Sequence, residues 1–293
     1  MAKITVGITI GDPSGVGPEI TLKAIKILKK SADFLVIGDP DKKGIIYGHP
    51  SAEYGRASME YLEQALELLR KKEIDCLVTC PISKEAINLA GFPYSGHTEY
   101  FAEKLRVKDP VMLLLNQHLR FSLLTRHIPL RQVAEKITAM KLQKNIQLTC
   151  QGLKNLFMIK RPRIVVCGLN PHASDNGVIG DEENRIISPA IKKFKTKLKA
   201  DIYGPLSADV AIKGLQQKSY DCAIAMYHDQ ALIPLKQFPG NHGVNLTLGL
   251  PIIRTSPLHG TAFDIAGKNI ACPDSLIAAI KLAVKCCLNQ RKA

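Results

Sequence analysis

Four histidines of this 293-residue chain follow short apolar runs of the kind that form buried strands. They are His97 in "SGHTE", His127 in "LTRHIP", His172 in "LNPHA" and His228 in "AMYHDQ". Three neutral imidazoles around a divalent ion leave one position open for substrate, which is the arrangement of catalytic zinc sites. The chain has no HExxH or CxxC signature, so such a site has to be assembled from distant segments. For each histidine taken singly, a structural or surface role is the ordinary alternative.

Cationic and amide side chains follow the last of these histidines. Lys236, Asn245 in "GVNLTLGL" and Arg254 in "PIIRTSP" are suited to binding a carboxylate or a phosphate. Ordinary surface charge is the alternative for Lys236 and Arg254. Arg254 directly follows the apolar run "GLPII", which favours burial. A divalent ion beside such groups could polarise a hydroxyl or carbonyl oxygen of the bound molecule.

A glycine-rich turn, "TIGDPSGVGPEI" at 9–20, leads from an apolar run into a helix-like segment. The free N–H groups at such a helix start suit an anion or a nucleotide. Gly11, Gly15 and Gly17 do not have the GxGxxG spacing, and a tight structural turn explains them equally well.

The elements that must position these side chains alternate along the chain. We expect strands at 4–10, 33–39, 75–81, 111–116, 163–170 and 221–228, and helices near 17–30, 57–72, 131–160, 184–199 and 274–289. This alternation indicates an α/β protein with largely parallel sheets, in which ligands bind at the carboxyl ends of strands. The long middle helical region favours two sub-domains with a cleft between them.

Composition excludes several classes of protein. The longest apolar runs are far shorter than a membrane-spanning helix, and the N-terminal stretch has no signal-peptide features, so we expect a cytoplasmic protein. The net charge of +14 is dispersed, only 5% of residues are aromatic and Trp is absent, which disfavours nucleic acid and fits attraction of small anions. The eight cysteines are expected to be reduced thiols in the core.

Several long motifs resemble one enzyme family over essentially the whole chain. In order, these motifs are "GDPSGVGPE", "SGHTE", "LNPHA", "GPLSAD", "AMYHDQALIPLK", "VNLTLGLPIIRTS" and "HGTAFDIAG". They are similar to the 4-hydroxythreonine-4-phosphate dehydrogenases of pyridoxal 5′-phosphate biosynthesis. The resemblance implies a fold like that of isocitrate and isopropylmalate dehydrogenases, with two α/β/α sub-domains and an NAD site that is not of the Rossmann type.

The resemblance assigns roles to the strand-end residues. The family's divalent metal (Zn²⁺, Mg²⁺, Co²⁺ or Mn²⁺) is held by three histidines, which His127, His172 and His228 match. The family is dimeric, with each site shared between subunits, so we expect a homodimer. The family's residues for the small phosphorylated substrate are matched by the following five positions: His97, Thr98, Lys236, Asn245 and Arg254.

The NAD site is expected at two segments. The turn contributes Asp12 and Gly15, and the segment "LHGTAFDIAGKNIA", which resembles the adenosine-binding loop of isocitrate dehydrogenases, contributes His259, Gly260 and Asp264. A carboxylate at Asp264 could accept hydrogen bonds from both ribose hydroxyls. Asp229, next to His228, is the candidate catalytic residue, as a support for that ligand or a proton-transfer group.

The implied reaction is the NAD-dependent oxidation and decarboxylation of 4-phosphooxy-L-threonine to 3-amino-2-oxopropyl phosphate. The NAD-side sub-domain is expected to comprise residues 1–92 and 250–293, and the metal, substrate and dimerisation sub-domain residues 93–249. Two segments depart from the family: 39–57 is compressed, and the loop after His172 is less glycine-rich than usual.

Three alternatives remain open at this stage. A paralogue acting on 4-phosphothreonate or 4-phosphoerythronate would keep the metal, phosphate and NAD sites. A true isocitrate-type enzyme needs acidic metal ligands, where this chain has histidines. A basic nucleic-acid-binding protein without catalysis is the alternative from another class.

Overall fold

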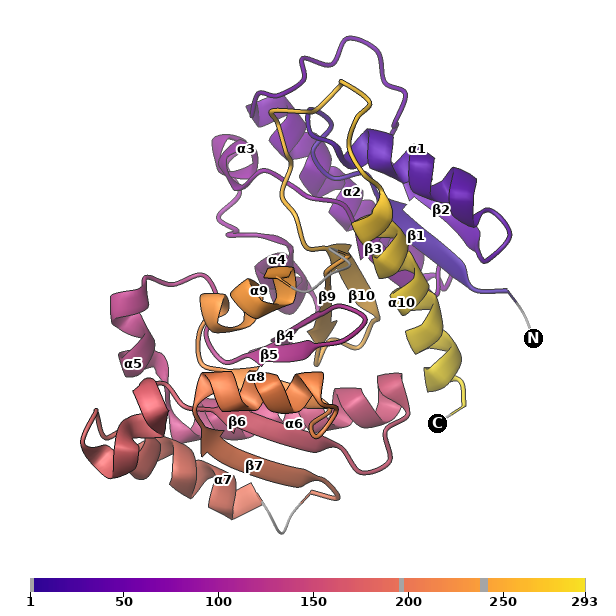
Figure 1. Ribbon diagram of the computed structural model, residues 1–293. Coiled ribbons are helices and arrows are strands. Elements are labelled where there is room, and N and C mark those ends of the chain that lie inside the picture. The colour runs from indigo at the N-terminus through magenta and orange to yellow at the C-terminus, as the bar shows by residue number, and fades with distance from the viewer. Residues whose placement is uncertain (1–2, 195–197, 238–241, 293) are drawn as a thin grey trace. The chain divides into compact units, whose positions relative to one another are not determined.

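The computed structural model describes residues 3–194, 198–237 and 242–292 (Figure 1). By its internal contacts the chain divides into two compact units. The first unit comprises Met1–Pro110 and Val244–Ala293, and the second comprises Val111–Gly243. The sequence prediction placed the boundaries near 92 and 249 instead, so His97, Thr98 and Asn245 belong to the first unit rather than the second.

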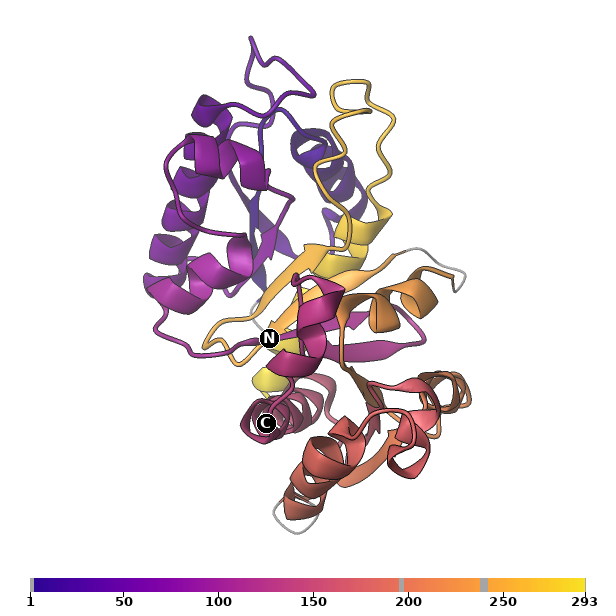
Figure 2. The ribbon, with the colours of Figure 1, turned by 90° about the vertical axis from the view of Figure 1, so that its left-hand side faces the viewer.

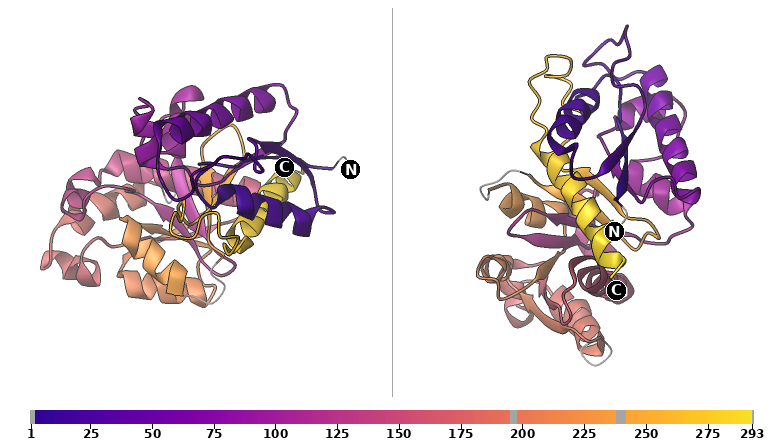
Figure 3. Two further views of the ribbon diagram at one scale, coloured as in Figure 1. Left: turned by 90° about the horizontal axis from the view of Figure 1, so that it is seen from above. Right: turned by 90° about the vertical axis from the view of Figure 1, so that its right-hand side faces the viewer.

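The first unit is built on five strands in the order β2-β1-β3-β10-β9. All neighbours are parallel except β10 and β9, which are antiparallel. Helices α1 and α10 cover one face of this sheet and α2 the other (Figure 3). The element bounds are β1 Thr5–Thr9, α1 Gly17–Leu28, β2 Asp33–Ile37, α2 Ala52–Arg70, β3 Cys76–Thr79, α3 Lys84–Leu89, α4 His97–Lys104, β9 Val244–Leu248, β10 Arg254–Pro257 and α10 Asp274–Gln290.

The core of the first unit follows from helical and strand periods. Leu62 and Leu66, one turn apart on α2, pack with Leu77 of β3 and Phe101 of α4, and all four are almost fully buried. Burial of side chains of this size stabilises a fold by about 1.5–3 kcal/mol each. The side chains of α2 and α4 therefore pack firmly against the sheet that carries the strand-end residues.

In its described residues, the second unit also has five strands, in the order β4-β5-β8-β6-β7. The strands β5, β8, β6 and β7 are parallel neighbours, and β4 is antiparallel to β5. Helix α6 packs on β4 and β5, and α8 packs on β6 and β8 (Figure 2). The bounds are β4 Val111–Leu115, β5 Arg120–Leu123, η1 Leu130–Gln132, α5 Val133–Lys136, α6 Ala139–Phe157, β6 Arg163–Cys167, η2 Pro171–Gly177, η3 Glu183–Ile187, α7 Ser188–Phe194, β7 Asp201–Leu206, α8 Ala208–Gln216, β8 Cys222–Ala225 and α9 His228–Gln237.

The six predicted strands and the helices α1, α2, α7 and α10 are present close to their expected positions. The predicted helical region at 131–160 is interrupted, because Thr138 is extended and its hydroxyl accepts the N–H of Lys141 as the N-cap of α6. All eight cysteines are free thiols, as predicted, but Cys272 is exposed instead of lying in the core. Among the described helices, none has the length and apolar character of a membrane-spanning segment.

Candidate active site

A buried arginine begins β10 in the first unit. Arg254 is 2% exposed, and its guanidinium donates hydrogen bonds to the hydroxyls of Thr79 on β3 and Thr247 on β9. Burial lowers the pKa of Arg254 to about 10, against the opposing effect of Glu99, so the side chain stays charged at neutral pH. A buried cation is costly unless an anion compensates it, which makes this position suited to a phosphate or a carboxylate.

His97 and Thr98 lie at the start of α4, close enough to Arg254 for its charge to act on the imidazole. Burial lowers the pKa of His97 well below its usual value near 6.5, and the charge of Arg254 adds to this effect. The ring is therefore neutral at pH 7. Its Nε2 is buried and makes no hydrogen bond to any residue that the structure describes. A buried polar atom of this kind is expected to have a bound partner.

Asn245 on β9 shares a sheet face with this arginine. It lies two residues before Thr247 and pairs with Ser256, two residues after Arg254, so all these side chains point to the same side. Asn245 is 8% exposed, and its Oδ1 also has no hydrogen-bond partner among the described residues. His97, Arg254 and Asn245, with Thr98 next to His97, are thus the four predicted substrate residues that belong to the first unit. The fifth, Lys236, is exposed near the end of α9 in the second unit.

The three predicted metal ligands follow three adjacent parallel strands of the second unit. His127, His228 and His172 come after β5, β8 and β6 respectively, at the carboxyl end of each strand. The rings of His127 and His228 lie 5.6 Å apart between centroids. Within the described ranges, no three His, Cys, Asp or Glu side chains come together as a metal site. Among the described residues, His172 is thus not grouped with the other two histidines.

His228 is the first residue of α9, and Asp229 follows it. Nδ1 of His228 lies 2.7 Å from Oδ1 of Asp229. A carboxylate at this nitrogen fixes the proton on Nδ1 and leaves Nε2 as the free lone pair, which is how supporting carboxylates orient metal-binding histidines. The predicted pairing of Asp229 with this histidine is thus present as a direct contact.

His172 lies on a left-handed turn. Residues 172–176 all have positive φ, between 45° and 70°, although none of them is glycine. This conformation is unfavourable for ordinary residues. Just before this turn, the backbone N–H groups of Leu169 and Asn170 donate to one carboxylate oxygen of Glu183, which is 1% exposed. The pKa of the nearby Asp209 is lowered mainly by a hydrogen bond from Ser207.

Gln230 links two of these strand ends, a role that sequence reasoning missed. Its Oε1 accepts the N–H of Met226 at 2.7 Å, and its Nε2 donates to the carbonyl of Gly168 at 2.9 Å. Thr125 makes the corresponding link from β5 by donating its hydroxyl to the carbonyl of Met226. Gln230 is the last residue of "YHDQ" and Glu183 the last residue of "GDEE". Their positions in these segments after predicted strands are the sequence signal that could have identified them.

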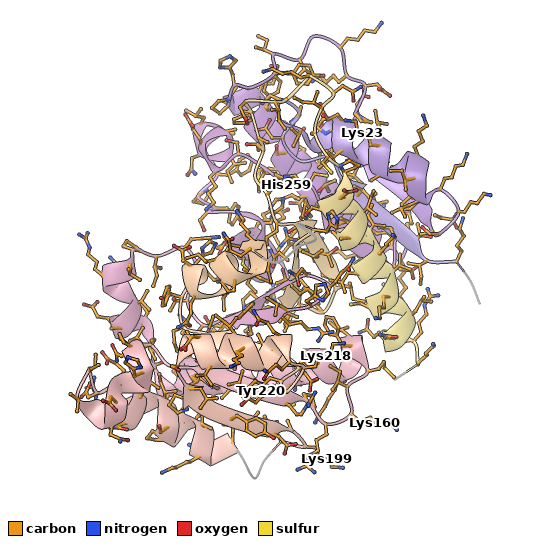
Figure 4. The ribbon with its side chains drawn as sticks, in the orientation of Figure 1. Lys23, Lys160, Lys199, Lys218, Tyr220 and His259 are labelled. Atoms are coloured by element: carbon orange, nitrogen blue, oxygen red, sulfur yellow. The ribbon has the colours of Figure 1, made fainter. Side chains whose placement is uncertain are left out.

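The two predicted NAD segments lie together in the first unit. Asp12 is fully buried, its Oδ1 accepts both the N–H and the hydroxyl of Ser14, and burial raises the pKa of its carboxyl against the lowering effect of these bonds. Gly15 contacts the backbone of the second segment, because an added Cβ would lie 3.0 Å from the carbonyl oxygen of Thr261. His259, Gly260 and Asp264 are exposed on that second segment; Figure 4 labels His259 there.

Comparison with known proteins matches this geometry to one family. Residues 12–283 match the family described as pyridoxal phosphate biosynthetic protein PdxA. A 4-hydroxythreonine-4-phosphate dehydrogenase of Sulfurihydrogenibium sp. (strain YO3AOP1) is 43% identical, over 96% of this chain and 98% of the relative. The crystal structure of the enzyme of that name from Klebsiella pneumoniae is 33% identical with a TM-score of 0.85, covering 98% of this chain and 100% of the other.

The predicted superfold is confirmed by a more distant structure. An isocitrate dehydrogenase of Methylococcus capsulatus is 15% identical with a TM-score of 0.50, covering 95% of this chain and 84% of the other. This likeness concerns the fold alone. The family match covers nearly the whole chain and the 43% identical relative is covered almost end to end, so the chain belongs to the family of pyridoxal phosphate biosynthetic proteins PdxA.

Proposed function

We propose that this chain is an NAD-dependent 4-hydroxythreonine-4-phosphate dehydrogenase. It would oxidise the C3 hydroxyl of 4-phosphooxy-L-threonine and release CO2, giving 3-amino-2-oxopropyl phosphate for pyridoxal 5′-phosphate synthesis. The observation that carries the proposal is the cluster of Arg254, His97 and Asn245. In this cluster, His97 Nε2 and Asn245 Oδ1 are buried and have no hydrogen-bond partner among the described residues. Relatives of this name that match nearly the full chain support the same conclusion.

The cluster is suited to hold one end of a doubly anionic substrate. Arg254 supplies a desolvated positive charge, and a bidentate contact to phosphate or carboxylate would use its planar guanidinium. The first N–H groups of α4 lack intrahelical partners and add further donors at His97 and Thr98. Asn245 Oδ1 can accept a hydrogen bond from an ammonium or hydroxyl group of the same ligand. Lys236, which is exposed, is proposed for the remaining anionic group.

The histidines fit a divalent metal that two chains share. His127 and His228 are near enough to ligate one ion, whereas His172 is not grouped with them in one chain. We therefore assign the third imidazole to His172 of a second copy. Asp229 would keep the proton on Nδ1 of His228 so that Nε2 faces the ion. When bound, the ion supplies a Lewis acid beside the C3 oxygen and NAD supplies the hydride acceptor.

Exposed apolar side chains near these histidines support a homodimer. Leu130 is 70% exposed three residues after His127, and Val178 is 81% exposed on the segment that follows η2. Met140, at the start of α6, is 80% exposed. Large apolar side chains as exposed as these commonly mark surfaces that a second protein covers. A second copy covering this surface would bring its own His172 towards the histidine pair.

For the dinucleotide we propose the turn with Asp12 and Gly15 and the loop with His259, Gly260 and Asp264. Asp264 is exposed on a series of turns at 263–269 and can accept from both ribose hydroxyls. A carboxylate there would also repel a 2′-phosphate, which favours NAD over NADP. The cytoplasmic location expected from the sequence stays a prediction.

An NADH absorbance assay with three substrates tests the proposed function. Purified protein is given NAD, a divalent metal and, in separate reactions, 4-phosphooxy-L-threonine, 4-phospho-D-threonate or 4-phospho-D-erythronate. The proposal expects kcat/KM to be highest for the amino acid, because Asn245 Oδ1 has an ammonium partner only in that substrate. Equal or faster turnover of either sugar acid would replace the vitamin B6 assignment with the paralogous one.

A further inference from the structure

The loop between β10 and α10, residues 258–273, is the segment assigned above to the dinucleotide. It has no helix or strand of its own, and Asp264, Lys268 and Ile270 are exposed on it. Its near end is fixed by a hydrogen bond from the N–H of Val16 to the carbonyl of Thr261, at 3.0 Å. A long loop that carries a binding site needs a second anchor to hold one shape.

That second anchor is a pair of charged side chains one turn apart on α1. Oε1 and Oε2 of Glu19 accept the backbone N–H groups of Ala271 and Asn269, at 2.8 and 3.1 Å. Nζ of Lys23 donates to the carbonyl oxygens of the same two residues, both at 2.9 Å. Glu19 and Lys23 also face each other at 3.5 Å. Figure 4 shows Lys23 on α1.

The four bonds satisfy both backbone groups of two loop residues, as a neighbouring strand would. The side chains of Glu19 and Lys23 are 14% and 29% exposed, so solvent competes only partly for their hydrogen bonds. Charge-assisted bonds of this kind are stronger than neutral ones. The two residues lie on the helix that the glycine-rich turn enters, so the pair ties both halves of the proposed dinucleotide site together.

We propose that Glu19 and Lys23 are positioning residues for the dinucleotide: they hold residues 269–271 on α1 and thereby fix the shape in which the loop receives NAD. This inference rests on the proposed function, since it takes the loop to be part of the NAD site. Neither residue touches the nicotinamide or the substrate in this account. They act on cofactor affinity through the backbone of the loop.

The test compares Lys23→Met and Glu19→Ala with Lys26→Met, an exposed lysine one turn further along α1. Kd for NADH is measured by its fluorescence, KM and kcat by NADH formation, and hydrogen exchange in peptides that cover 264–272. Loss of either anchor is expected to raise Kd for NADH and KM for NAD roughly tenfold, with kcat at saturating NAD within about twofold of wild type. Exchange should speed up in the same peptides, and Lys26→Met should behave as wild type.

The double variant adds a check, because the two side chains share the same two backbone partners. Relative to wild type, the double variant should raise Kd by less than the product of the two factors by which the single variants raise it. Faster exchange with an unchanged Kd for NADH would overturn the inference, and so would equal effects in Lys26→Met. If wild-type protein binds NADH but does not oxidise 4-phosphooxy-L-threonine, the proposed substrate is wrong while the Kd comparison still decides the inference. If wild-type protein does not bind NADH, both are wrong.

Discussion

His97 combines a position in the proposed substrate site with a pKa that is lowered from its usual value. It lies beside the buried cation Arg254, and burial is the main reason for its lowered pKa. A neutral imidazole with a buried, unpartnered Nε2 can either donate or accept a hydrogen bond towards the substrate, depending on its tautomer. Protonation would place two positive charges in the same buried cluster. The cluster should therefore work only above the folded-state pKa of this ring.

The same shift predicts how stability depends on pH. The folded-state pKa of His97 is below the value near 6.5 of a free imidazole, so the unfolded chain binds this proton first as the pH falls. The contribution of His97 is therefore fully present above about pH 6.5 and is lost as the pH falls towards the folded-state pKa. The urea midpoint of wild-type protein should drop between about pH 7.5 and 5.5 by more than that of His97→Gln. His118→Gln, at an exposed histidine, is the control, and identical drops in wild type and His97→Gln would contradict this origin of the pH dependence.

At the scale of elements, the short segments after the strands carry the chemistry. The strand ends of β5, β8 and β6 are tied to one another by Thr125 and Gln230, so the histidines that follow them have fixed starting points. The turn of His172 is the most strained of these segments, with positive φ at residues 172–176. Such a conformation persists only where its surroundings hold it. Glu183 holds the backbone directly before the turn, at Leu169 and Asn170.

Replacing Glu183 with Gln tests this support. The amide would point an N–H group at the Asn170 amide, which now donates to Glu183 Oε2 at 2.9 Å, and would weaken the bonds to two backbone N–H groups. We expect apparent metal affinity to fall by about 10–100-fold, the usual loss when a support of a metal ligand is removed. Metal titration followed by turnover measures this. Glu182→Gln is the matched control, because Glu182 also accepts a hydrogen bond from the Asn170 amide whereas the N–H groups of Leu169 and Asn170 donate to Glu183, and a loss as large in the control would argue against a special role for Glu183.

The sequence was sufficient for the elements with strong periods. The strands β1, β3, β4, β6 and β8 are almost wholly buried apolar runs, and α2 and α6 carry long amphipathic patterns. It did not predict β5, β7, β9 or β10. β5 begins with Arg120 and contains Ser122, β7 contains Gly204 and Pro205, and Asn245 and Arg254 of the proposed site interrupt the apolar pattern of β9 and β10. The apolar strand pattern is thus weakest in the strands that carry the proposed site residues.

Candidate site residues were predictable for a different reason. His127, His172, His228 and Arg254 stand in long motifs at strand ends, whereas Glu19 and Lys23 lie inside a helix. On the sequence alone, Glu19 and Lys23 form an ordinary i,i+4 pair on an amphipathic helix. Their bonds to Asn269 and Ala271 span about 250 residues of chain, and no local pattern reports a contact of that range. Hydrogen bonds from side chains to a backbone segment so distant in the sequence can be identified only in the three-dimensional structure.

At the scale of the whole molecule, the proposed three-histidine metal site requires two copies of the chain. His127 and His228 form a pair in one chain, and His172 is assigned to the other. His172→Ala and His228→Ala should each be inactive as homodimers. Mixing the two variants under conditions that exchange subunits should restore about a quarter of wild-type activity, since half of the dimers are mixed and each has one complete site. Ligands from a single chain predict no recovery on mixing. Size-exclusion chromatography with light scattering checks that both variants remain dimeric.

The net positive charge of the chain is compatible with the proposed function. A net charge of +14 raises the local concentration of anionic substrate and dinucleotide, and this attraction weakens with salt. The alternative of a non-catalytic nucleic-acid-binding protein finds no support among relatives that match nearly the full chain as dehydrogenases.

The most direct test of the central claim follows absorbance of NADH on adding 4-phosphooxy-L-threonine and NAD to the metal-loaded protein, before and after a chelator. The account predicts one NADH and one CO2 per substrate consumed, loss of turnover with the chelator and recovery when a divalent ion is returned. NADH formation that is indifferent to the chelator would contradict the three-histidine site. No NADH formation in the metal-loaded protein would contradict the proposed function itself.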